Sequence, residues 1–109
     1  MIGKRVVVTG MEMVSPLGND LKTSWEKLIA GKSGIAPITR FDCSQYTTRI
    51  AGEIKDFNPE LFIPRKQVRR MDRFNLYAMA CAKSLLAQSG FQINQENDNY
   101  TGILLGCGL

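Results

Sequence analysis

Runs of apolar residues predict buried strands near both ends of the chain. Arg5–Thr9 is a β-branched run that Gly10 ends, and Thr101–Leu105 is a second apolar run. Continuous apolar runs of this length are typical of strands that are buried on both faces. Ile50–Ile54 is a weaker candidate for a short strand, because Gly52 interrupts it.

A turn and an amphipathic helix follow the first run. Ser15-Pro16-Leu17-Gly18 is a turn signal, and Asn19 or Asp20 can cap the helix that begins after it. Gly31 is placed to end this helix, and the segment from there to residue 48 is expected to be irregular. The apolar positions of the helix repeat at helical spacing and form one stripe: Leu21, Trp25, Leu28 and Ile29.

Helical spacing returns between Lys66 and Ser89, with a possible break and a new cap at Asp72 and a C-cap at Gly90. Residues 76–82 are apolar on all sides, which predicts a buried central helix. The order strand, helix, irregular segment, helix, strand predicts an α/β layer with a parallel pair of strands joined by helices. Because two or three strands cannot cover both faces of a parallel sheet, we expect the chain to be part of a larger domain.

Composition excludes several classes of function. The 109 residues include 14 Lys and Arg, 10 Asp and Glu and no His, for a net charge of +4. Without His, the chain by itself cannot complete a Ser-His-Asp triad, a Cys-His dyad or a His-ligated metal site. No apolar run approaches the roughly 20 residues of a membrane span. The three cysteines are far apart and odd in number, so we expect reduced thiols in a cytoplasmic protein.

The positive charge is concentrated in residues 65–73. This segment contains five basic residues and one acid, so its net charge equals the +4 of the whole chain. Lys66, Arg69, Arg70 and Arg73 have the spacing of one helical face if the helix is continuous there. A charge run is ordinarily a solvated face, but this concentration favours an acidic partner. Nucleic acid is a weaker candidate, because no aromatic residues interleave with the charges.

Three short motifs look like catalytic or binding signatures, and each has a simpler explanation. Gly31-Lys32-Ser33 is similar to the end of a phosphate-binding loop, but it ends a helix instead of opening one. Cys81 stands in a sequence that resembles a nucleophile signature, yet burial in mid-helix favours an inert thiol. Cys107 lies between two glycines after a strand, as an elbow nucleophile does. Because the chain has no His to act as its base, a small residue that lines a pocket is the better interpretation.

Several stretches, taken in order, resemble the β-ketoacyl-acyl-carrier-protein synthases. The resemblance is closest to the synthase II branch of bacterial type II fatty-acid synthesis, and it covers essentially the whole chain. It begins with Val-Val-Val-Thr-Gly at residues 6–10 and Val-Ser-Pro-Leu-Gly at residues 14–18. The later blocks keep the expected spacing, at residues 25–31, 33–35, 41–42, 50–53, 56–57 and 70–74.

The resemblance implies a thiolase-like fold, in which two similar α/β halves form a layered α-β-α-β-α arrangement. Residues 1–109 would be an incomplete, N-terminal portion of the first half. The implied activity is a decarboxylative Claisen condensation of an acyl-enzyme with malonyl-acyl-carrier protein. The family's catalytic Cys and two His lie downstream, so this chain holds no catalytic residue and is expected to be inactive alone. No cofactor or metal is implied, and the full-length enzyme is expected to be a homodimer.

Some residue roles follow from the resemblance. Lys66, Arg69 and Arg70 match positions that bind the carrier protein, and Leu109 matches an apolar gate over the acyl pocket. Cys107 stands where the family usually has Ser. Glu12 stands where it usually has Gly, so a positive φ there would cost about 1–2 kcal/mol.

Two alternatives to an enzyme segment use the same basic residues. The first is a non-catalytic truncated module that binds an acidic partner through residues 65–73. The second, a weaker one, is a nucleic-acid-binding fragment. Salt-dependent binding to an acidic protein, compared with binding to DNA, separates these two.

Overall fold

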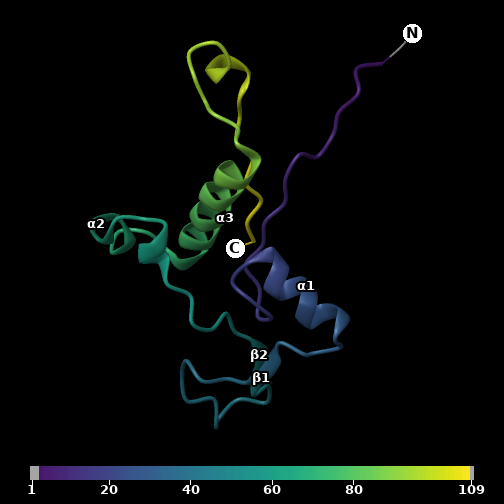
Figure 1. Ribbon diagram of the computed structural model, residues 1–109. Helices are drawn as coiled ribbons and strands as arrows, with labels where there is room; N and C mark the ends of the chain where they lie inside the picture. The colour runs from purple at the N-terminus through teal and green to yellow at the C-terminus, as the bar shows by residue number, and fades with distance from the viewer. Residues whose placement is uncertain (1–2, 109) are drawn as a thin grey trace.

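Helices and one small antiparallel ribbon make up the regular structure of residues 3–108, which the computed structural model describes (Figure 1). Extended segments and loops account for most of the remainder. In chain order the elements are α1 (Leu21–Ile29), β1 (Ile35–Pro37), β2 (Ile50–Gly52), the 3₁₀ helix η1 (Pro59–Leu61), α2 (Arg65–Val68), α3 (Arg73–Ser89) and a second 3₁₀ helix, η2 (Asp98–Tyr100).

The first helix begins and ends as the sequence predicts. Asp20 is its N-cap: one carboxylate oxygen accepts a hydrogen bond from the Thr23 N–H at 2.7 Å, and the other accepts one from the Thr23 hydroxyl at 2.8 Å. These bonds hold the pKa of Asp20 below its usual value. Gly31 follows the helix with φ +67°, the left-handed conformation that glycine adopts without strain. The preceding turn closes through reciprocal backbone hydrogen bonds between Ser15 and Gly18, at 2.8 and 3.1 Å.

The long helical segment breaks where the sequence predicts. α2 ends at Val68, and Asp72 has extended backbone, with φ −67° and ψ 155°. α3 then begins at Arg73 and ends at Gly90, whose φ is +67°. The prediction that residues 76–82 are buried on all sides is only partly right, because Leu76 and Ala80 are buried and their neighbours are half-buried.

The predicted parallel pair of strands is not formed. Residues 5–9 and 101–105 are extended but pair with no other strand within residues 3–108, and Val6 is 93% exposed. A β-strand needs a neighbour to satisfy its backbone donors and acceptors, and this part of the chain brings none beside either segment. The sheet that does form is antiparallel and pairs Ile35 with Gly52 and Pro37 with Ile50. β1 lies in the segment 31–48, for which the sequence predicts irregular structure, whereas β2 confirms the first part of the short strand predicted at Ile50–Ile54.

A buried carboxylate holds the loop between β1 and β2. Glu53 is 8% exposed. It accepts hydrogen bonds from the hydroxyl and the backbone N–H of Thr39, the shortest at 2.7 Å, and from the Arg40 N–H at 3.2 Å. The Thr39 hydroxyl, these backbone bonds and the Arg40 charge lower the pKa of Glu53, although burial opposes them. The loop is therefore fixed by polar contacts and not by an apolar core.

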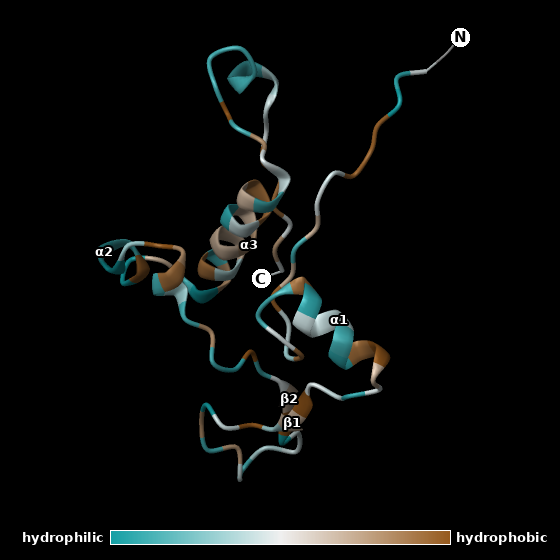
Figure 2. Cartoon of the chain, viewed as in Figure 1, coloured by the Kyte–Doolittle hydropathy of each residue, from teal (hydrophilic) through white to brown (hydrophobic). Residues whose placement is uncertain are grey.

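The apolar core is small for a chain of this length. Ile63, Leu76 and Ala80 are its buried hydrophobic residues, within the described part of the chain. Figure 2 shows hydrophobic residues on the N-terminal extended segment and at the end of α1, where they face solvent. The radius of gyration is 17.6 Å, against about 13 Å for a compact chain of similar length. Within residues 3–108, no helix has the length and apolar composition that crossing a membrane requires.

Candidate functional site

Four basic side chains surround an open depression at α2. Arg65, Lys66, Arg69 and Arg70 line a hollow of about 760 Å³, and all four residues are exposed. We call this feature the basic depression. Its lining contains four of the five basic residues of segment 65–73, which carries the net positive charge of the chain. A wide, open and positively charged hollow is suited to the surface of an acidic partner and not to a small enclosed ligand.

Contacts with α3 hold the segment that carries the basic depression. Ile63 is 1% exposed and lies directly before Pro64, at which α2 is initiated. The Lys83 ammonium on α3 donates a hydrogen bond to the Phe62 carbonyl at 2.7 Å. Phe57 packs edge-to-face on Tyr77 of α3, with ring centroids 4.9 Å apart. These contacts anchor the short helix on a longer one, so the basic side chains extend from a supported backbone.

The basic residues do not lie on one continuous helix. After α2, Arg70 N–H donates to the Gln67 carbonyl at 2.9 Å, which continues the chain in a tighter turn. Extended backbone at Asp72 then starts α3 in a new direction. Arg73 consequently lines a different hollow, with Phe57 and Tyr77. The condition under which Arg73 would share a face with the other basic residues, a continuous helix, is therefore not met.

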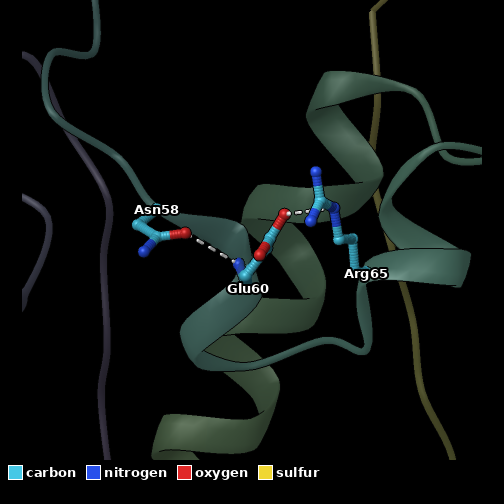
Figure 3. Close-up of polar contacts among 3 residues, drawn as sticks. All are labelled: Asn58, Glu60 and Arg65. Carbon is cyan, nitrogen blue, oxygen red and sulfur yellow. Dashed lines mark hydrogen bonds and ion pairs between the residues drawn. The ribbon is translucent and has the colours of Figure 1, made fainter.

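One member of the basic depression has an acidic partner. The Arg65 Nε lies 3.6 Å from a carboxylate oxygen of Glu60 in η1, and the two side chains are 71% and 51% exposed. Figure 3 shows that Asn58 holds the same turn, because its side-chain oxygen accepts a hydrogen bond from the Glu60 N–H at 3.0 Å. Within residues 3–108, the side chains of Lys66, Arg69 and Arg70 form no ion pair. Sequence reasoning missed the pair, since Glu60 and Arg65 are separated by a non-helical turn.

An apolar groove lies along α3, beginning at Met71 just after the basic depression in the sequence. It encloses about 240 Å³ between α3 and the extended segment 101–108, and its lining is mainly apolar, including Met71, Met79, Ala82, Ile103 and Leu105. The apolar residues 76–82 of α3 are the feature of the sequence that indicates an apolar surface here. Leu109, expected as a gate over an acyl pocket, lies outside the described residues. Cys107 is exposed in the same extended segment.

The two cysteines that resemble nucleophiles have different surroundings. Cys81 is half-buried on α3. Burial raises the pKa of its thiol and the nearby Glu12 carboxylate raises it further, while a hydrogen bond from the Val14 N–H opposes them. This environment favours the protonated, unreactive thiol. No histidine exists in the chain to act as a base for either cysteine.

Glu12 connects the loop after the first extended segment to both long helices. One carboxylate oxygen accepts hydrogen bonds from Met13 N–H at 3.0 Å and Leu21 N–H at 2.6 Å. The other accepts from the Ser84 hydroxyl at 3.0 Å and the Gln88 amide at 2.6 Å. Partial burial alone would raise the pKa of Glu12, but these four hydrogen bonds lower it overall. The strain that a positive φ at Glu12 would impose does not arise, because Asp56 is the only non-glycine residue with positive φ within residues 3–108.

Comparison with known proteins places these features in a family context. The family model described as "Beta-ketoacyl synthase, N-terminal domain" matches residues 3–109. The chain is 45% identical over 106 residues to a 3-oxoacyl-[acyl-carrier-protein] synthase 2 of Coxiella burnetii. The aligned region covers 97% of this chain and 26% of that protein. The protein of the same name from Vibrio cholerae is 43% identical over 109 residues, covering 100% of this chain and 26% of that protein. The chain thus spans about a quarter of the length of these relatives.

A solved structure supports the same relationship in three dimensions. The ishigamide ketosynthase/chain length factor superposes with a TM-score of 0.69 at 32% identity. The superposition covers 88% of this chain and 23% of that one. This chain and the ketosynthase therefore share their fold over most of the length of this chain.

Proposed function

We propose, because this chain belongs to the β-ketoacyl synthase family, that it forms part of a 3-oxoacyl-acyl-carrier-protein synthase and that its basic depression binds the carrier protein. The fold is accordingly the N-terminal part of a thiolase-like α/β fold, incomplete in these residues. One observation carries the proposed role: Lys66, Arg69 and Arg70 converge on an open hollow and have no acidic partner within residues 3–108.

The proposed reaction is a decarboxylative Claisen condensation. Loss of CO₂ from a malonyl thioester supplies the carbanion, which attacks the carbonyl carbon of an acyl-enzyme thioester. A C–C bond forms, and the enzyme thiolate leaves. An activated nucleophilic cysteine must carry the acyl group. The residues of this chain supply no such group, so their proposed contribution is to bind the carrier protein and to form part of the acyl pocket.

The charges of the basic depression are suited to transient docking. Carrier proteins are strongly acidic, so Coulomb attraction accelerates the encounter and weakens as salt is added. Arg69 and Arg70 each offer several N–H donors to carboxylates. Because the site is exposed, each contact contributes modestly, and we expect neighbouring residues to matter together.

The apolar groove is a candidate wall of the acyl pocket. Its lining from α3 and from Ile103 and Leu105 is suited to a hydrocarbon chain. Under this proposal Leu109, four residues beyond Leu105, would act as a gate, as the resemblance implies. Arg70 lines the basic depression and Met71, the next residue, lines the groove, so the linings of the two proposed sites are contiguous in sequence.

Charge reversal in the complete synthase tests the docking role. Arg69→Glu with Arg70→Glu should raise the apparent KM for acyl-carrier protein by at least about tenfold, near 1.4 kcal/mol. A short acyl thioester without the protein should be turned over as before, because under this proposal Arg69 and Arg70 bind the carrier protein and not the acyl group. Equal loss on both substrates would indicate misfolding, and no loss on either would contradict the docking role.

A non-catalytic module is the second candidate function. The absence of His from all 109 residues favours it for the chain by itself. Such a module would bind an acidic protein through the same basic depression without forming product. Binding by the isolated chain without condensing activity would agree with this candidate.

A further inference from the structure

We propose that Glu60 is a specificity-determining residue of the basic depression, which engages Arg65 internally and directs an acidic partner to Lys66, Arg69 and Arg70. This inference rests on the proposed docking function and concerns how that same surface selects its contacts. The observation behind it is that one of the four lining cations has an acidic partner within the chain and the other three do not, within residues 3–108.

The backbone of Glu60 is held by its own turn. The side-chain oxygen of Asn58 accepts a hydrogen bond from the Glu60 N–H at 3.0 Å, and Pro59 begins the 3₁₀ helix. The next turn is closed by the Phe62 N–H, which donates to the Pro59 carbonyl at 3.0 Å. This arrangement places the Glu60 carboxylate toward Arg65, the first residue of α2 (Figure 3).

The ion pair reduces the positive charge that a partner meets on the side of the basic depression nearest η1. The carboxylate lies 3.6 Å from Arg65 Nε, so it offsets the positive charge nearest η1. An exposed pair of this kind is weak, because water and salt screen it. A partner's carboxylate could therefore displace Glu60 from Arg65, but it would then face a second carboxylate in the same place. Like-charge repulsion disfavours that docking position and favours the three unpaired cations.

Removing the charge of Glu60 should enlarge the usable surface. In the complete synthase, Glu60→Gln should lower the Kd for acyl-carrier protein about two- to fivefold at low salt. Arg65→Gln should have little effect in the unmodified protein and a larger one in the Glu60→Gln background. Such a difference is expected if Arg65 is paired with Glu60 in the unmodified protein and is free to bind the carrier protein in Glu60→Gln.

A matched control separates this effect from net charge. Glu96→Gln makes the same charge change at an exposed residue in the loop before η2, away from the residues that line the basic depression. It should leave the Kd unchanged. An equal gain from Glu96→Gln would overturn the proposal, because net charge alone would then explain the result.

The test distinguishes failure of this inference from failure of the docking function. If charge reversal at Arg69 and Arg70 weakens binding while Glu60→Gln leaves it unchanged or weakens it, the role of Glu60 is wrong and docking stands. If charge reversal at Arg69 and Arg70 has no effect, the docking function is wrong, and the role of Glu60 is wrong with it. Arg65→Gln effects that are equal in both backgrounds would also overturn the proposal.

Discussion

The Glu12 carboxylate joins three segments that are far apart in sequence. We expect Glu12→Gln to lower the free energy of unfolding of the synthase by about 1 kcal/mol at neutral pH. The loss is smaller than for a fully buried carboxylate, because Glu12 is only half-buried and solvent screens its hydrogen bonds. The amide nitrogen of Gln cannot accept the bonds from Ser84 and Gln88 that a carboxylate oxygen accepts. Urea denaturation measures the difference.

The pH dependence of this difference follows from the lowered pKa of Glu12. A carboxyl whose pKa is lower in the folded state stabilises the protein above its unfolded pKa and loses that contribution as the pH falls through the folded pKa. The gap between the unmodified protein and Glu12→Gln should therefore narrow in acid. Glu26→Gln, at an exposed position of α1, serves as the control. A gap that widens in acid would contradict the assigned hydrogen bonds.

The cysteines give a second prediction at the scale of single residues. Cys107 should react with a thiol reagent faster than Cys81 in the folded protein, read out by mass spectrometry. Burial, with the nearby Glu12 charge, raises the pKa of Cys81 and excludes reagent, whereas Cys107 is exposed. Faster labelling of Cys81 would mean that the α3 environment is wrongly assigned.

At the scale of elements, the end of α3 depends on one backbone conformation. Gly90 has φ +67°, and no side-chain or distant atom lies within 4 Å of the place where a Cβ would stand. Gly90→Ala should therefore cost about 1–2 kcal/mol through backbone strain alone. Gly90→Asn should cost less, because Asn tolerates this conformation. Thermal unfolding compares the two variants, and an equal loss in both would contradict a purely conformational origin.

The helices and the short strand β2 could be predicted from the sequence, whereas the pairing of the two terminal apolar segments could not, for a physical reason. The cap at Asp20, the break at Asp72 and the end at Gly90 depend on nearby residues, and all three are confirmed. Strand formation depends on a distant neighbour. Residues 5–9 and 101–105 have the composition of buried strands, yet they lie unpaired, because pairing needs a segment that residues 3–108 do not place beside them.

At the scale of the whole molecule, much apolar surface lacks a cover. Val7, Trp25 and Leu104 are among the large hydrophobic residues that are more than half exposed. Exposed apolar surface on this scale marks contact surfaces. We therefore propose that the remainder of a synthase packs against the extended segments and α1. The fold could be assigned from the sequence only through the family resemblance, because residues 3–108 do not form the full set of layers.

The isolated chain should have no condensing activity. The reaction needs an activated thiolate with positioned acid-base partners, and neither Cys81 nor Cys107 has a His to serve it. A radiolabelled malonyl substrate would report elongation of acyl-carrier protein by the purified 109-residue chain. Measurable elongation would contradict the assignment of all catalytic groups to other parts of the enzyme.

The candidate site was partly predictable at this scale. The concentration of charge in residues 65–73 is visible in the composition, and the roles of Lys66, Arg69 and Arg70 came from the resemblance and stay predictions. The break at Asp72 that separates Arg73 is predictable from the sequence, but the direction of α3 after the break is not, because the angle between α2 and α3 depends on how both pack beside η1. The pairing of Glu60 with Arg65 could not be predicted either, because it depends on how η1 packs beside α2.

The salt dependence of carrier-protein binding shows whether the basic depression is the docking surface for the carrier protein. The Kd of acyl-carrier protein for the complete synthase should be measured at rising ionic strength, with and without Arg69→Glu and Arg70→Glu. Affinity should fall steeply with salt in the unmodified protein. After charge reversal it should be at least about tenfold weaker at low salt and should fall less steeply as salt is added. Equal affinities and equal slopes for the two proteins would contradict it.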